Sequence, residues 1–131
     1  MHTALAAAAL LHLGDAAQQR RFLAPMLRGE TIGCWAYAEA GAGADVSTVA
    51  TRARREGEEY VLDGTKLYIT NAPFADVMVV VASSAPGQGV KGLSLFIVER
   101  GTPGLAVGTP LGKLGMGASP IVNGGRVILV C

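Results

Sequence analysis

From Thr31 onward the chain consists of short apolar or β-branched runs, each of which ends at glycine, proline or aspartate. This pattern constrains the fold more than any other feature, because such runs form strands and the residues between them form turns. Glycine accounts for 18 of the 131 residues, whereas its usual share is roughly 7%. The surplus fits many tight turns, and the spacing of the runs predicts a compact antiparallel β-barrel or β-sandwich domain.

Four turn signals separate the expected strands. Gly57 turns the chain out of an alternating run, and Asp63-Gly64 is a strong short signal for a β-hairpin. Gly101–Gly104 and Lys113–Gly115 predict two further turns. The expected strands are Thr48–Arg55, Tyr60–Leu62, Leu67–Thr70, Val77–Ala82, Leu93–Glu99, Leu105–Val107 and Arg126–Val130.

Two helices are expected before the strands. Thr3–Leu13 is rich in alanine and leucine and stops at Gly14, a good residue for a helix C-terminus. Asp15 can cap a second helix that runs to about Leu27. Pro25 is expected to kink or shorten the end of this second helix.

The second helix carries an apolar stripe at helical spacing. Two antiparallel helices this short rarely stand alone in water, so we expect them to need partners and the isolated chain to self-associate. The prediction for the whole chain is an α+β fold. Residues 1–30 form the end of a helical domain as a short hairpin, and residues 31–131 form a truncated β domain. The stripe consists of Phe22, Leu23, Met26 and Leu27.

Composition argues against several classes of partner. The net charge is +1, and the basic cluster around Arg54 is followed at once by glutamates, so no nucleic-acid partner is expected. Cys34 and Cys131 are too few for a disulfide framework, and we expect Cys34 to be a buried thiol in a reducing compartment. The two histidines have no second ligand at metal spacing, so no metal site is expected. Ala4–Leu13 is too short to span a bilayer, and we interpret it as a buried helix rather than a signal-peptide core.

The residues that could carry chemistry gather in two stretches, Trp35–Asp45 and Lys66–Asn71. In the first, an apolar run ends in small residues around Gly41 and Gly43, whose backbone can bend sharply and lets a flat ligand approach closely. A turn of this kind on its own more often only connects two strands. Asp45 is expected to cap a local turn rather than to perform acid–base chemistry.

The second stretch pairs an aromatic ring with a hydroxyl. Tyr68 and Thr70 are two residues apart on an expected strand, so their side chains should point to the same side. Such a pair suits a flat heteroaromatic ligand, although a half-buried strand with Tyr68 over the core fits the pattern too. Glu39 has no carboxylate, histidine or cysteine partner in its surroundings in the sequence, and it is not nominated as a catalytic base.

Several ordered motifs lie at matching spacing. Glu39–Asp45 reads E-A-G-A-G-A-D, and Asp63–Ala72 reads D-G-T-K-L-Y-I-T-N-A. With Phe96–Gly104 and Lys113–Gly115, these segments resemble the signature segments of the acyl-CoA dehydrogenases. The lead-in at residues 13–30 also resembles that family, so the resemblance covers nearly the whole chain.

The resemblance implies a fold of three parts, a helical domain, a middle β domain and a C-terminal four-helix domain. This chain resembles the end of the first and most of the second. The implied cofactor is FAD, with Thr70 hydrogen-bonding near the flavin N5, the atom that receives hydride. The glutamate that removes the α-proton lies in the C-terminal part, so no catalytic residue is expected in this chain. The implied flavin contacts are Trp35, Tyr37, Ala38, Gly41, Gly43, Ala44, Tyr68, Ile69 and Thr70, and the implied substrate contacts are Ala44 and Ser84.

The chain departs from the family pattern at several site positions. Ala38 and Ala44 stand where the family has threonine and serine, so two hydroxyls are absent. Ala40 replaces a proline, Tyr68 replaces the more usual tryptophan, and Gly117 stands where arginine is common.

The resemblance implies an oxidoreductase: an acyl-CoA dehydrogenase, or a fragment of one, for FAD-dependent α,β-dehydrogenation of an acyl-CoA thioester. Its partners would be acyl-CoA and an electron-accepting flavoprotein, and family members form homo-oligomers. Two alternatives stay open, a non-catalytic remnant or flavin- and thioester-binding module, and an acyl-CoA oxidase or flavin monooxygenase relative. We expect a cytoplasmic location, or the mitochondrial matrix in a eukaryote, although no transit peptide is evident.

Overall fold

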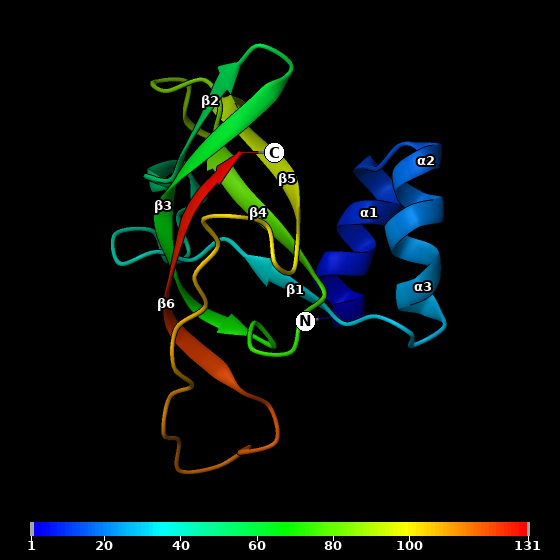
Figure 1. Ribbon diagram of the computed structural model, residues 1–131. Coiled ribbons are helices and arrows are strands. Elements are labelled where there is room, and N and C mark those ends of the chain that lie inside the picture. The colour runs from blue at the N-terminus through cyan, green and yellow to red at the C-terminus, as the bar shows by residue number, and fades with distance from the viewer. Residues whose placement is uncertain (1, 131) are drawn as a thin grey trace.

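A pair of helices lies beside a six-stranded sheet in the computed structural model, which describes residues 2–130 (Figure 1). The backbone alone is described for residues 123–130. The first helix consists of the π-helical segment His2–Ala7 and α1 (Ala8–Leu13). The second consists of α2 (Ala16–Gln18), the π-helical segment Gln19–Leu23 and α3 (Ala24–Leu27).

The helix ends form where the sequence predicts them. The Gly14 amide donates to the Leu10 carbonyl at 3.0 Å and closes α1. The Asp15 carboxylate accepts from the Ala17 and Gln18 amides, each at 2.8 Å, while the Gln18 side chain accepts from the Asp15 amide at 3.0 Å. This reciprocal pair is a capping box, which satisfies amides that a helix start otherwise leaves without partners.

The strands of the sheet follow the order β1-β4-β2-β3-β6, with β5 paired to β4 outside that path. One edge of β4 is fully occupied by antiparallel β5. The other edge is shared by β1 and by a single pairing with β2, and both of these run parallel to β4. The strands are β1 (Gly33–Ala36), β2 (Arg52–Glu56), β3 (Glu59–Thr70), β4 (Val77–Ser83), β5 (Leu93–Glu99) and β6 (Ile121–Val130).

The central position of β4 in the sheet explains why the sequence of this strand is continuously apolar. Met78, Val80 and Ala82 face a core that β1, β3 and β5 complete. Val77 and Val79 face the helices, where they pack with residues such as Leu10, Phe22 and Met26. Because both faces of β4 are covered, an unbroken apolar run is stabilised there rather than an alternating one.

The expected α+β class is confirmed, with a helical hairpin followed by the β domain. The sheet is mixed, because β1 and β4 are separated in the sequence by the β2–β3 hairpin and can therefore run parallel. Val77–Ala82 and Leu93–Glu99 are strands as predicted, and Arg126–Val130 belongs to the longer β6.

The predicted hairpin at Asp63-Gly64 is wrong. Both residues lie inside β3, and the real hairpin turn is at Gly57, which has φ of +66° between β2 and β3. Gly64 is small for another reason: a Cβ there would lie 2.2 Å from Thr51 Oγ1. Close packing between β3 and the neighbouring segment, rather than a turn, explains this glycine.

Two strand predictions also differ from the structure. β2 begins only at Arg52, because Val46–Thr48 forms a single 3-10 turn that Asp45 caps. Leu105–Val107 is no strand but part of the connection between β5 and β6. The Leu105 amide donates to the Thr102 carbonyl at 3.1 Å, so the turn at Gly101–Gly104 reaches into that segment.

The helices keep large apolar side chains on their outer surface. Leu11, Leu13 and Leu27 are 54%, 72% and 66% exposed, although Phe22, Leu23 and Met26 of the predicted stripe are buried. We expect the purified chain to bind a hydrophobic dye and to self-associate, because apolar surface of this kind favours contact with a partner. Leu13→Gln with Leu27→Gln should reduce both dye fluorescence and the apparent size in gel filtration.

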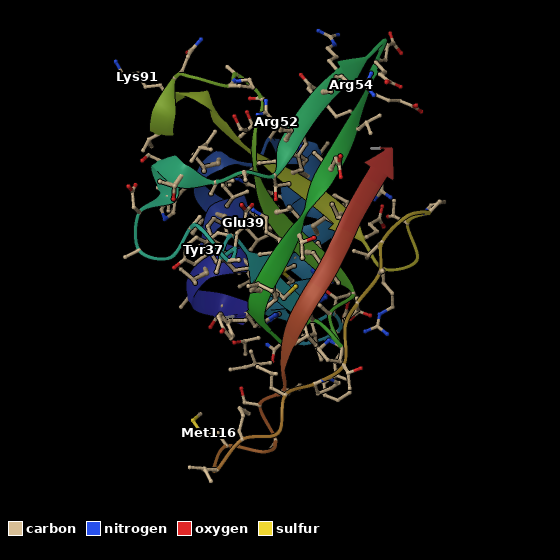
Figure 2. All side chains as sticks on the ribbon, turned by 90° about the vertical axis from the view of Figure 1, so that its left-hand side faces the viewer. Tyr37, Glu39, Arg52, Arg54, Lys91 and Met116 are labelled. Carbon is tan, nitrogen blue, oxygen red and sulfur yellow. The ribbon has the colours of Figure 1, made fainter. Side chains whose placement is uncertain are left out.

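The control is Leu114→Gln, on the loop before β6 and far from the helices, where Met116 marks the tip of the loop (Figure 2). Leu114 is fully exposed, so this change removes similar apolar surface elsewhere. A monomeric parent chain without dye binding would contradict the expectation, as would an equal effect of Leu114→Gln.

Candidate functional site

The fold brings together the two stretches that the sequence analysis selected. The Leu67 amide of β3 donates to the Ala38 carbonyl at 2.8 Å, and Lys66 Nζ donates to the Tyr37 carbonyl at 3.1 Å. Tyr37 and Glu39 therefore lie close to each other and to β3 (Figure 2). The segment that leaves β1 thus runs against the middle of β3.

A buried ion pair stabilises the contact between the segment after β1 and β3. Lys66 Nζ lies 2.7 Å from Glu39 Oε1, and the Lys66 and Glu39 side chains are only 2% and 6% exposed. The Glu39 carboxylate also accepts from the Ala50 amide at 2.6 Å, the Thr51 amide at 3.0 Å and the Thr51 hydroxyl. A buried charge is tolerated when it is paired and hydrogen-bonded in this way.

The same contacts decide the protonation of the pair. Burial by itself would raise the pKa of Glu39, but hydrogen bonds from Lys66, Thr51 and the Ala50 amide outweigh it and hold the pKa below its usual value. Burial lowers the pKa of Lys66, and Glu39 opposes that effect. Glu39 is therefore held as a carboxylate that is already fully engaged, which does not suit a general base.

Sequence reasoning missed Lys66 as the partner of Glu39. A usable signal was present, because Leu62, Gly64 and Lys66 alternate along β3 and so share one face. Leu62 is buried, so a lysine on the same face requires a carboxylate nearby.

The glycine turn is an open surface loop with one buried residue. Glu39 and Ala42 exchange two backbone hydrogen bonds, of 3.0 and 3.2 Å, and Ala42 is fully buried. Gly41 and Gly43 do not have positive φ, so the sharp bend is not what requires glycine there. A Cβ on either would meet nothing within 4 Å, which leaves the backbone open to a close approach from outside.

Asp45 caps the turn that follows, as predicted. Its carboxylate accepts from the Ser47 amide at 2.9 Å and from the Ser47 hydroxyl at 2.6 Å. These bonds lower the pKa of Asp45 below its usual value. Thr48 Oγ1 then donates to the Gly41 carbonyl at 3.0 Å, which ties the capped turn back to the glycines.

Tyr68 lies at an irregularity in β3. The register with β6 shifts on both sides of Leu67, and Tyr68, with φ of +55°, has no partner in β6. Tyr68 is 60% exposed, Ile69 is buried, and Thr70 is half-buried. The alternation of buried and exposed residues is therefore interrupted between Lys66 and Ile69, while Tyr68 and Thr70 still flank the buried Ile69.

The other aromatic candidates lie on β1 and just after it. The Trp35 and Tyr37 rings pack together with centroids 6.5 Å apart and planes inclined by 42°. Both are half-buried and alternate with Cys34 and Ala36, which point into the opposite core. Cys34 is the buried thiol that the sequence predicts, and burial raises its pKa to about 12.

Ser84 lies on the exposed loop after β4. Its hydroxyl is 2.6 Å from the Ser94 hydroxyl and 3.3 Å from the Gly92 carbonyl. A polar groove of about 140 Å³ separates this loop from the Ser47–Arg52 segment. Arg52 and Lys91 lie at this end of the sheet (Figure 2). The groove is smaller than the roughly 300–1,000 Å³ of a ligand pocket, so these residues form part of a wall rather than an enclosed site.

A larger groove lies elsewhere. About 620 Å³ are enclosed between the helices and β5, by side chains that include Leu10, Phe22, Tyr60 and Phe96. None of the implied flavin or substrate contacts lines it. Among the side chains that the structure describes, those of residues 2–122, no group of three or more from histidine, cysteine, aspartate and glutamate is arranged to hold a metal ion. No helix in the same part of the chain is long and apolar enough to cross a membrane.

Comparison with known proteins identifies the family to which this domain is similar. Residues 34–123, from β1 into β6, match the model of the acyl-CoA dehydrogenase middle domain. The chain belongs to the acyl-CoA dehydrogenase family. The resemblance noted in its motifs is thereby confirmed.

Individual relatives agree. The mouse mitochondrial short-chain specific acyl-CoA dehydrogenase is 42% identical over 114 residues, which are 87% of this chain and 28% of the relative. The structure of butyryl-CoA dehydrogenase from Megasphaera elsdenii superposes with a TM-score of 0.93 at 32% identity, over 98% of this chain and 34% of that one. The structure of an FAD complex of PigA superposes with a TM-score of 0.88 at 31% identity, over 94% of this chain and 33% of that chain. The chain thus spans about a third or less of the length of these relatives.

The Glu39 pair predicts a pH dependence of stability. Because the pKa of Glu39 is lowered on folding, its stabilising contribution is present above its ordinary pKa of 4.5 and is lost as the pH falls through the folded value. Glu39→Gln should therefore lower the free energy of unfolding at about pH 7, and its difference from the parent should shrink below pH 4.5. Urea unfolding of both proteins across this range measures the difference.

Glu56→Gln is the matched control, since Glu56 pairs with Arg54 on the surface of the β2–β3 hairpin. Exposed pairs contribute little, so this variant should stay close to the parent at every pH. A Glu39→Gln difference that does not change with pH would refute the assigned ionisation.

Proposed function

We propose that this chain forms the middle-domain wall of a flavin site in an acyl-CoA dehydrogenase. The parent reaction is FAD-dependent α,β-dehydrogenation of an acyl-CoA thioester. The observation that carries the proposal is the direct contact between the two family motifs, through Leu67 to Ala38 and Lys66 to Glu39, within a matched middle domain. The match covers only 28% of the mouse relative, so we propose that the dehydrogenation also requires domains other than the one described here.

The chain divides, on this proposal, into the end of a helical domain at residues 1–30 and a middle β domain at residues 31–131. The last helix ends at Leu27 and the first strand begins at Gly33, which supports a boundary between them. The family match beginning at residue 34 supports the same division.

The residues present fit one side of a flavin. Tyr68 offers an exposed ring, Thr70 a half-buried hydroxyl, and Gly41 and Gly43 an open backbone surface. A flat heteroaromatic ring can stack on such a side chain and accept or donate hydrogen bonds at its edge. FAD, when bound, supplies the acceptor for the hydride that leaves the β-carbon.

This chain's own residues hold and orient rather than remove protons. On this proposal Thr70 would hydrogen-bond near the flavin N5, and Trp35, Tyr37, Ala38 and Ile69 would support the wall around it. Glu39 is unavailable as the base because Lys66, Thr51 and two backbone amides already occupy its carboxylate. The α-proton is therefore left to a group outside these residues.

The substrate side of the proposal involves Ala44 and Ser84. The exposed Ser84 hydroxyl borders the loop that faces the segment after the glycine turn, which supports a role in contacting the CoA portion. An electron-accepting flavoprotein and further copies of the chain are proposed as partners. A mitochondrial-matrix or cytoplasmic location belongs to the same proposal, and the mouse relative is mitochondrial.

Flavin binding tests the proposal without turnover. The wall has one ring and one hydroxyl, and Ala38 and Ala44 lack the family's hydroxyls, so we expect a Kd no better than on the order of 10 μM. Tyr68→Ala and Thr70→Val should each weaken binding several-fold, because a typical hydrogen bond or ring contact contributes about 1 kcal/mol. Quenching of flavin fluorescence in a titration with the protein measures the affinity.

Glu59→Gln, at the tip of the β2–β3 hairpin, is the control and should bind like the parent. Equal affinity of the parent and all three variants would show that Tyr68 and Thr70 are not at the flavin site. The assignment of this wall would then be dropped.

A further inference from the structure

Tyr68 adopts a conformation that its residue type disfavours. An aromatic residue with φ of +55° is an outlier, since only glycine, asparagine and aspartate visit this region with ease. Such a conformation persists where the surrounding structure over-determines it, and it often marks a functional position. The structure therefore has to contain something that holds Tyr68 in place.

The residues on either side of Tyr68 are fixed. Lys66 is held by Glu39 and by the Tyr37 carbonyl, while Ile69 is buried to 4% exposure in the core. Between them, the Leu67 amide is engaged by the Ala38 carbonyl, outside the sheet ladder. Leu62 and Lys66 are four residues apart and both face inward, yet Ile69 faces inward only three residues later. Between Lys66 and Ile69 the ladder with β6 passes over one residue on each strand, Tyr68 on β3 and Gly124 on β6, so Tyr68 is the β3 residue that bulges out of the ladder.

We call the bonded group of Glu39, Thr51 and Lys66, with the carbonyls of Tyr37 and Ala38, the β3 clamp. Its members come from three separate segments, the residues just after β1, the residue just before β2 and the middle of β3. A slip of β3 by one residue would turn Lys66 to the opposite face of the sheet. It would also leave the buried Glu39 carboxylate without its cation, which is costly.

We propose that Glu39 and Lys66 are positioning residues, which fix the bulge of β3 and thereby hold the Tyr68 ring exposed on the strand that the segment before the glycine turn contacts. The pair acts on both parts of the wall, because Glu39 begins the Glu39–Ala42 turn and Lys66 precedes the bulge. The ligand that meets this surface rests on the proposed function above. The positioning itself can be tested without any ligand.

Amide hydrogen exchange resolved to single residues is the direct test. In Lys66→Met the Leu67 amide should exchange at least about tenfold faster relative to amides of the β4–β5 ladder, because its acceptor Ala38 is no longer held in place. Normalising to that ladder separates loss of the clamp from general loss of stability. Arg54→Met removes the cation of an exposed pair on the same hairpin and should leave Leu67 unchanged.

A gentler pair of variants covers the case in which Lys66→Met does not fold. Thr51→Val keeps the side-chain volume but removes the hydroxyl that donates to Glu39, whereas Thr51→Ser keeps the hydroxyl. Thr51→Val should raise the relative exchange rate of the Leu67 amide several-fold. Thr51→Ser should leave that rate close to the rate in the parent chain. A role in stability alone predicts no such selective change. Unchanged relative exchange at Leu67 in Thr51→Val and in any folded Lys66→Met would overturn the proposal.

Flavin titration of the same variants separates this proposal from the proposed function. Weaker flavin binding that follows faster Leu67 exchange supports both, with about a tenfold loss expected for Lys66→Met. Faster exchange with unchanged flavin affinity supports the clamp and counts against the flavin wall. Unchanged exchange overturns the clamp, and the Tyr68→Ala and Thr70→Val titrations then decide the flavin wall independently.

Discussion

The arrangement of the β domain around its candidate site depends on one buried ion pair, between Glu39 and Lys66. A pair taken out of water costs desolvation that its attraction barely repays, unless further hydrogen bonds satisfy the charges. Here Thr51 and the amides of Ala50 and Thr51 provide those bonds to the carboxylate, and the Tyr37 carbonyl accepts one from the ammonium. The pair is therefore better understood as fixing which segments meet than as a source of stability. It joins the segment after β1, the approach to β2 and the middle of β3, which are far apart in the sequence.

Local signals were sufficient for the elements whose partners are also local. Gly14 and Asp15 end one helix and begin the next through backbone and side-chain bonds within a few residues, and both ends were predictable. Val77–Ala82 and Leu93–Glu99 could be predicted as strands because their apolar runs are short and bounded by turns. The family motifs likewise identified the β domain.

Features set by distant partners could not be predicted from local signals. Gly64 resembles a hairpin residue, but it is small because Thr51 packs against its backbone, and nothing in the neighbouring sequence reveals Thr51. The bulge at Tyr68 depends on Lys66, Leu67 and Ile69 being fixed by segments that precede β2 and follow β5. The same pattern of residues would form a regular strand if those partners were absent, which is why alternation alone did not predict the irregularity at Tyr68.

The family motifs therefore contain residues of two kinds. Glu39, Lys66 and Gly64 make the shape, since each is buried or packed against another segment, whereas Tyr68, Gly41 and Gly43 are exposed toward whatever binds. The departures from the family at Ala38 and Ala44 remove hydroxyls but leave every contact of the clamp in place. On the proposed function, these two alanines reduce the hydrogen-bonding capacity of the flavin wall without disturbing the Glu39–Lys66 ion pair. The chain would then keep the shape of a flavin wall. The hydrogen bonds that hydroxyls at positions 38 and 44 would make to the ligand would have to come from backbone amides or from another part of the protein.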